Sequence, residues 1–495
     1  MTSFFQHLKF LTLGALVAFI LPPFNFPPYL LFICFIPLLK YLEFANYKER
    51  FIAGAFFGLG YFVVLLKWLT VVGIDALIAL SLICALWWAL ASALSFLFRD
   101  SKFWPIWFGI SWTAVEMVRD RFPWGGFGWG QLGTVWVDTP FSGIYSLIGQ
   151  IGMTCLTYIL IALIFKQSRR RRDENLSRSV SQFAFVAILL FSGSYISYVF
   201  QPILISSSNS IQIAAVQGGV ERTGLGVLGE PRAVLEKHIS QSMQHLSRIN
   251  KADLVVWPES SVDLDPFKDQ TTQNLLQNLD AQIEPPLLVN GTIYKPDNLK
   301  NNLSMLIQDQ QIVPIYQKQR LVPFGEFLPL REFIETYTDR ASLLSIDYQP
   351  GKAPGNLEIS NINLGILICF EIADDSLIHK QIADQSAVIV QTNNATYQNL
   401  GQSEQQELYT RLRAIETGRP IISIATSGIS LTVDDHGNVI DRITQDEEGL
   451  LYIQVQEISG VTIATKLHLF YQMIIPFFFI GGLLAAFFKR FTIKS

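Results

Sequence analysis

The stretch Leu364–Asp374, LGILICFEIAD, decides how this 495-residue chain is interpreted. Its first five residues are Leu, Ile or Gly, which is typical of a strand buried on both faces of a sheet. Cys369 follows this run directly, and Glu371 stands two positions later, so on a strand their side chains would share a face. We therefore expect a thiol and a carboxylate at the end of a buried strand.

Two other charged residues follow apolar runs in the same way. Glu259 follows the apolar residues of VVWPESS. Lys318 stands near the start of YQKQRLVPFGE, and Glu326 lies eight residues further on. Charged groups attached to apolar segments are costly to bury unless they meet one another. The pattern predicts that these groups gather at one rim.

A carboxylate, an ammonium and a thiol in one place suit acyl transfer through a thioester. Thiolate is the attacking form of cysteine, and a free cysteine is mostly protonated at neutral pH. Glu259 can remove that proton and Lys318 can hold a developing oxyanion. Read singly, each residue has a plainer explanation, since a free Cys is commonly an inert core residue.

Several stretches resemble the nitrilase (carbon–nitrogen hydrolase) superfamily, and most closely its membrane-embedded branch, the apolipoprotein N-acyltransferases. The resemblance covers nearly the whole chain and is carried by FPWGGFGWGQ, AAVQGGV, WPES, KQRLVPFGEFLPL, CFE, QTNNATY, RLRAIETGRP and ATSGIS. It implies an αββα sandwich in which Glu259 is the general base, Lys318 the oxyanion-stabilising lysine and Cys369 the nucleophile. It also implies that Glu326 and Glu371 are needed for activity.

The chain departs from this family at two places. Phe370 stands directly after Cys369 where the family often has Tyr, so a supporting side chain loses its hydroxyl. Residues 218–235 lack the Trp that the family tends to carry there. Neither change touches the three residues of the proposed triad.

Phe324, Phe327 and Leu328 crowd one short segment close to Lys318. One explanation is that they pack inside the domain, as apolar side chains usually do. The other is a lid that dips into the outer leaflet and admits an acyl chain to Cys369, since loops on a rigid scaffold often carry function.

Composition indicates a membrane protein, because half of the residues are hydrophobic and only 16% are charged. Apolar runs long enough for spanning helices, about 17–25 residues each, occur near 5–22, 28–45, 50–70, 74–98, 103–120, 141–166, 180–201 and 468–490. We predict an N-terminal transmembrane domain of about seven helices at 1–205, a catalytic domain at 206–462, and a transmembrane helix with a tail at 463–495.

Between 206 and 460 the hydrophobic runs shorten to strand length. Strands are predicted at 211–217, 252–258, 285–294, 302–308, 363–371 and 386–394, and helices at 230–250 and 403–418. This alternation favours an α/β domain with helices outside a two-sheet core. Gly437 and Asn438, between two apolar runs, mark a hairpin turn.

Basic residues predict the orientation of the chain. If the N-terminus is cytoplasmic, the cytoplasmic loops and tail carry Lys48 and Arg50, Arg99 and Lys102, Arg169–Arg172, and Lys489, Arg490 and Lys494. By the positive-inside rule both termini are cytoplasmic, and the catalytic domain lies on the periplasmic side of a bacterial inner membrane.

Charge and metal-binding residues limit the function classes. A net charge of −4 with no further basic cluster argues against nucleic-acid binding. Cys369 is the only cysteine between 206 and 462, so no disulfide is expected within that domain. The six histidines are scattered, and we expect neither a metal nor another cofactor.

Two functions remain open. The resemblance implies an enzyme that moves an acyl chain from a phospholipid, through a thioester on Cys369, to the N-terminal amine of a diacylglyceryl-cysteine lipoprotein. That reaction is the final step of lipoprotein maturation, and we expect the enzyme to be a monomer. The alternative is a membrane-bound amidase or nitrilase-type hydrolase that uses water as its acceptor.

Overall fold

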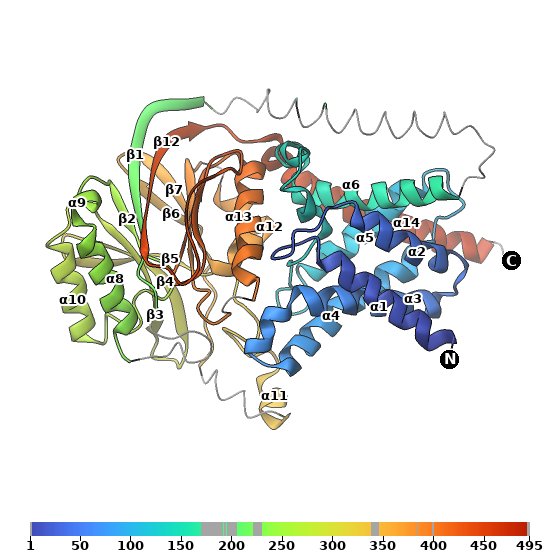
Figure 1. Cartoon of the computed structure of the whole chain (residues 1–495), viewed down its shortest axis with the longest axis horizontal. Coiled ribbons are helices and arrows are strands. Elements are labelled where there is room, and N and C mark those ends of the chain that lie inside the picture. The colour runs from blue at the N-terminus through green and yellow to red at the C-terminus, as the bar shows by residue number, and fades with distance from the viewer. Residues whose placement is uncertain are drawn as a thin grey trace. The chain divides into compact units, whose positions relative to one another are not determined.

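The computed structural model describes residues 2–169, 192, 195, 205–220, 230–337, 346–382, 384–397 and 400–492. The chain divides into two compact units: Met1–Pro202 with Thr462–Ser495, and Ile203–Val461 (Figure 1). The predicted span at 180–201 lies almost entirely outside the described residues.

The described helices of the first unit are α1 (Thr2–Ala18), α2 (Leu30–Phe44), α3 (Tyr47–Leu65), α4 (Ile74–Leu94), α5 (Trp104–Arg119), α6 (Tyr145–Ser168) and α14 (Ile463–Thr492). They coincide with the predicted apolar runs. Among the described residues, three stretches are long and apolar enough to cross a membrane, namely Ile74–Leu94, Ser142–Ser168 and Ile463–Phe488. The apolar stretch Phe5–Ala18 is shorter.

Small residues allow α1 and α3 to approach closely. A Cβ atom on Gly60 would lie 1.9 Å from the carbonyl oxygen of Leu11, and one on Gly14 would lie 1.8 Å from that of Phe57. Such glycine contacts are common between helices in membranes, where backbones must pack without a hydrophobic driving force.

A buried ion pair links α5 to the aromatic loop that follows it. Glu116 and Arg119 are 2% and 1% exposed, and Arg119 Nε donates to Glu116 at 2.9 Å. Trp88 Nε1 donates to the same carboxylate at 2.6 Å. Arg119 also donates to the carbonyl oxygen of Trp129 at 2.9 Å, so the pair fixes the loop's backbone.

In the part of the chain that the structure describes, the second unit contains two six-stranded sheets. The first has the order β12-β1-β2-β3-β4-β5 and the second β11-β10-β9-β8-β7-β6. Strands of the first sheet are β1 (Ile205–Gln217), β2 (Leu254–Val256), β3 (Leu287–Tyr294), β4 (Lys300–Gln308), β5 (Gln311–Gln317) and β12 (Gly449–Ser459). Strands of the second are β6 (Gly355–Ile359), β7 (Ile362–Ile368), β8 (Ala387–Thr392), β9 (Ile421–Ala425), β10 (Ser430–Val433) and β11 (Val439–Ile443).

Alternating side chains of β1 show how the layers are built. Ile211 and Ile213 join the core between the two sheets, together with Ile366 and Ile368 of β7. Ala214 and its neighbours on the other face pack against helices on the outside of the sheet. These are α8 (Ala233–Gln244), α9 (Leu246–Ile249) and α10 (Gln270–Asp280).

The second sheet is covered by α12 (Asp375–Gln381) and α13 (Gln402–Thr417) (Figure 1). This arrangement confirms the predicted αββα sandwich. All six predicted strands and both predicted helices are present, the helix at 230–250 being divided into α8 and α9. The predicted hairpin turn also joins β10 to β11.

Candidate active site

The strand β7 delivers Cys369 to the edge of its sheet. It ends at Ile368, and the chain enters the short 3₁₀ helix Cys369–Ala373. Cys369 has φ 53°, in the left-handed region that residues other than glycine rarely adopt. Such strain persists only where surrounding contacts hold it. Glu371 supplies one contact by accepting the Ile368 N–H at 2.8 Å.

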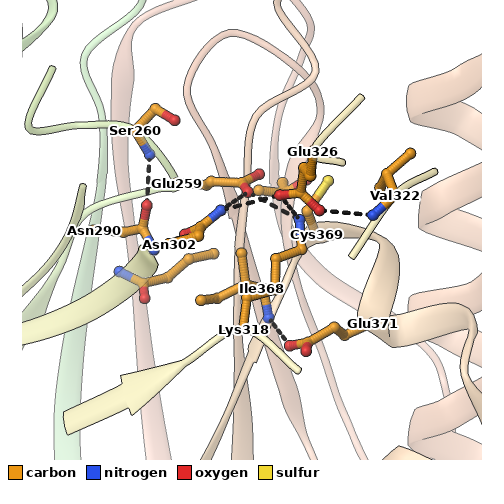
Figure 2. A network of polar contacts seen from close by, with 12 residues as sticks. Glu259, Ser260, Asn290, Asn302, Lys318, Val322, Glu326, Ile368, Cys369 and Glu371 are labelled. Carbon is orange, nitrogen blue, oxygen red and sulfur yellow. Dashed lines mark hydrogen bonds and ion pairs between the residues drawn. The ribbon is translucent and has the colours of Figure 1, made fainter. Parts of the chain in front are cut away.

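Lys318 follows β5 directly and is 2% exposed. Its Nζ atom donates to Glu326 Oε1 at 2.8 Å and to Glu259 Oε1 at 3.2 Å. Asn302 of β4 donates to the same Glu259 oxygen at 2.8 Å. Figure 2 shows Cys369 next to this group, so the structure brings together the thiol, the ammonium and two of the three predicted carboxylates.

Contacts from the second sheet hold the segment that carries Glu259. Gln391 of β8 donates to the carbonyl oxygen of Trp257 at 2.7 Å and accepts from Ser304 of β4 at 2.5 Å. Thr426, which follows β9, donates to the carbonyl oxygen of Glu259 at 2.7 Å. The carboxylate therefore has a fixed position although its own strand is only three residues long.

Glu371 has a different environment from the other two carboxylates. Because the strand ends before Cys369, the shared strand face expected for the two residues is not formed. Glu371 is fully buried and accepts from the Tyr316 hydroxyl at 2.9 Å and from the backbone N–H groups of Gln319 and Arg320 at 2.7 and 2.9 Å. It thereby ties the segment after Lys318 to the Cys369 turn, and Figure 2 shows its contact with Ile368.

Burial and charge set the protonation states. Burial, with a further contribution from Glu259, raises the pKa of the Cys369 thiol to about 12, against the opposing effect of Lys318. Burial alone lowers the pKa of Lys318, but Glu259 and Glu326 together raise it well above its usual value. The resting site therefore holds a neutral thiol beside a permanent ammonium, and the thiol needs a base before it can attack.

The apolar residues after Lys318 differ from one another in exposure. Phe324 is 48% exposed and has φ 66°, whereas Leu328 is only 8% exposed and packs within the fold. Phe327 and Phe370 are half-buried. Burial does not favour the lipid-contact role predicted for Leu328, and Phe324 offers the most accessible apolar surface of the three residues predicted to form a lid.

Asn302, Gln391 and Thr426 were not among the residues predicted from sequence. Asn302 and its neighbour Asn301 stand near the start of a strand, and two adjacent polar residues there are typical of a strand end that faces solvent. Gln391 and Thr426 belong to QTNNATY and ATSGIS, two stretches that carried the family resemblance. Polar residues at the ends of adjacent buried strands were the signal that could have identified them.

Asp434, Asp435 and His436 are close enough together to hold a metal ion. They lie in the turn between β10 and β11, where Asp434 Oδ1 accepts the backbone N–H groups of His436 and Asn438. Turn geometry therefore accounts for their proximity.

Comparisons with known proteins match both units. Residues 212–461 match the carbon–nitrogen hydrolase family model, and residues 13–163 match the model of the apolipoprotein N-acyltransferase N-terminal domain. An apolipoprotein N-acyltransferase of Shewanella oneidensis is 25% identical, over 93% of each chain. One of Mycolicibacterium smegmatis is 30% identical over 52% of this chain, and that match spans 45% of its own length. A solved amidase of Nesterenkonia sp. AN1 is 15% identical, with a TM-score of 0.40, over 53% of this chain and 95% of the amidase.

The fold and the site define a cysteine-containing αββα domain joined to a unit of apolar helices. The chain belongs to the carbon–nitrogen hydrolase family, and within it to the membrane branch of apolipoprotein N-acyltransferases. It is an enzyme of the acyltransferase type, as the resemblance implied.

Proposed function

We propose that this enzyme transfers an acyl chain from a phospholipid to the N-terminal amine of a diacylated lipoprotein, through a thioester on Cys369. The observation that carries the proposal is the shared contact of Glu259 and Glu326 with Lys318, next to a protonated thiol. The match of residues 13–163 to the apolipoprotein N-acyltransferase N-terminal domain supports acyl transfer over hydrolysis.

In the first half-reaction Glu259 takes the proton of the Cys369 thiol. The thiolate attacks the ester carbonyl of the phospholipid, and the resulting oxyanion accepts a hydrogen bond from Lys318. The tetrahedral intermediate then releases the lysophospholipid alkoxide, which takes the proton back from Glu259. The acyl chain stays on sulfur as a thioester.

In the second half-reaction the lipoprotein amine attacks the thioester carbonyl. Lys318 again donates to the oxyanion, and Glu259 takes a proton from the attacking nitrogen. Collapse forms the amide and releases the Cys369 thiolate, which recovers its proton from Glu259. In this scheme Glu326 keeps Lys318 in place, so that Glu259 is free to move protons between the reactants.

We further propose a location for this chemistry. The basic loops favour a bacterial inner membrane with both termini in the cytoplasm and the catalytic domain on the periplasmic side. Phe324 and Phe327 would then contact the acyl chains of membrane lipids. We also propose that the enzyme is active as a monomer. The 48% exposure of Phe324 supports this lipid-facing role.

Intact-protein mass spectrometry tests the proposal. With phospholipid and no acceptor, the protein should gain the mass of one acyl group, and Cys369→Ser should gain none because a hydroxyl is far less acidic than a thiol. A diacylated lipopeptide with a free amine should remove the added mass, whereas its N-acetylated counterpart should not. Steady release of free fatty acid without acceptor would support the hydrolase instead.

A further inference from the structure

Three parallel strands of the second sheet end beside one another at the site. Ile368 of β7 pairs with Gln391 of β8, so the next residues in register are Cys369 and Thr392. Thr392 in turn pairs with Ala425 of β9. The hydroxyl of Thr392 is therefore presented at the same edge as the sulfur of Cys369.

A buried network of amides surrounds the Thr392 hydroxyl. Gln406 of α13 donates through Nε2 to Thr392 Oγ1 at 2.9 Å and to the carbonyl oxygen of Cys369 at 3.4 Å. Gln406 Oε1 accepts from Asn394 at 2.9 Å and from Gln402 at 3.2 Å. All four side chains are at most 5% exposed. Because its oxygen has two donors, the amide of Gln406 can turn only its nitrogen toward Thr392.

The orientation of Gln406 determines what the Thr392 hydroxyl can do. Its oxygen already accepts from Gln406, so its single proton is available to one of the remaining neighbours. In the structure that proton goes to Asn394 Oδ1 at 2.9 Å. The Cys369 sulfur is the alternative acceptor for this proton, since hydrogen bonding from the Thr392 hydroxyl and from the backbone N–H of Asn393 lowers the pKa of the Cys369 thiol.

We propose that Thr392 is a further catalytic residue, whose hydroxyl turns from Asn394 to the Cys369 sulfur when the thiolate forms. The proposal rests on the acyl-transfer function described above and adds a hydrogen-bond donor to the sulfur itself. The thiol proton still goes to Glu259, and the hydroxyl keeps its own proton throughout. The same contact stabilises the thiolate as it leaves in the second half-reaction.

Alkylation of Cys369 by iodoacetamide at pH 8 tests the contact without any lipid. A hydrogen bond to a charged group, when lost, raises the thiol pKa by about one unit or more. That rise lowers the thiolate fraction about tenfold, while the more basic thiolate becomes roughly threefold more nucleophilic. Thr392→Val should therefore be alkylated about threefold more slowly, and Thr392→Ser, which keeps the hydroxyl, at the parental rate.

Thr432→Val is the matched control. Thr432 lies in β10 of the same sheet and is fully buried, and its hydroxyl has no hydrogen-bond partner among the described residues. Its alkylation rate should equal that of the parent. An unchanged rate in folded Thr392→Val, or an equal loss in Thr432→Val, would overturn the proposal. If the parent enzyme transferred no acyl group but Thr392→Val were still alkylated more slowly than the parent, the result would count against the proposed function and not against the Thr392 contact.

Discussion

Two clusters of buried charge in the catalytic domain have the same balance of one cation and two carboxylates. In the site, Lys318 contacts Glu259 and Glu326. Behind the Cys369 turn, Arg413 of α13 contacts Asp375 and Glu416. Arg413 also donates to the carbonyl oxygen of Ile372 at 3.1 Å and to that of Ala373 at 3.0 Å.

The difference between the clusters lies in how the cation's donors are used. The guanidinium of Arg413 binds two backbone carbonyls and two carboxylates in a fixed plane, which holds the 3₁₀ helix that starts at Cys369. The ammonium of Lys318 binds two carboxylates and adjoins a thiol, whose proton one carboxylate can accept. The same charge balance thus supports chemistry in one cluster and backbone geometry in the other.

The largest loss of turnover per folded molecule in this comparison is expected for Glu259→Gln. Loss of a general base typically lowers the rate by about 10²–10⁴. Iodoacetamide alkylation should change in the opposite direction, because removing the Glu259 charge lowers the raised pKa of Cys369 and increases the thiolate fraction. Single-turnover acylation and alkylation at pH 8 measure the two effects. A parallel fall in both rates would contradict the electrostatic account of this carboxylate.

Lys318→Met is expected to lower the rates of both half-reactions by about 10²–10³, since each passes through an oxyanion. Here alkylation should fall as well, because the lost ammonium is one of the groups that lower the pKa of the Cys369 thiol. Slower alkylation of Lys318→Met and faster alkylation of Glu259→Gln would distinguish the group that stabilises the thiolate from the carboxylate that destabilises it. If Lys318→Met were alkylated faster than the parent, Lys318 would not act on the sulfur.

Sequence alone identified the charged residues that end or follow buried strands. Glu259, Lys318 and Cys369 were recognisable because each polar group interrupts an apolar run, and the structure places all three together. Arg413 was not recognisable, since an arginine in a polar helix usually faces solvent. Its burial depends on the α13 packing, which no local pattern encodes.

The fold could be predicted as far as its layers and six of the twelve strands that the structure describes. The pairing of β1 with β12 joins residues about 250 positions apart, such as Ile205 and Ser459, and periodicity contains no information on such partners. Asn302 and Gln391 were missed for the same reason, because their importance comes from the opposite sheet. The resemblance supplied the sandwich, and the contacts within it required the structure.

Arg413→Lys is expected to give the smallest effect on turnover per folded molecule. Lysine keeps the charge but cannot reach two carbonyls and two carboxylates at once, so hydrogen bonds to a charged group are lost and the free energy of unfolding falls by about 2–3 kcal/mol. The reacting groups are untouched, and turnover per folded molecule should change less than about threefold. Thermal unfolding followed by tryptophan fluorescence, beside single-turnover acylation, measures both quantities.

Arg442→Lys is the matched control, because Arg442 pairs with Glu407 at 2.9 Å on a half-exposed surface, where an ion pair contributes about 0–1 kcal/mol. A stable Arg413→Lys protein with turnover as low as that of Lys318→Met would mean that the second cluster also takes part in the chemistry, and the distinction between the two clusters would not hold.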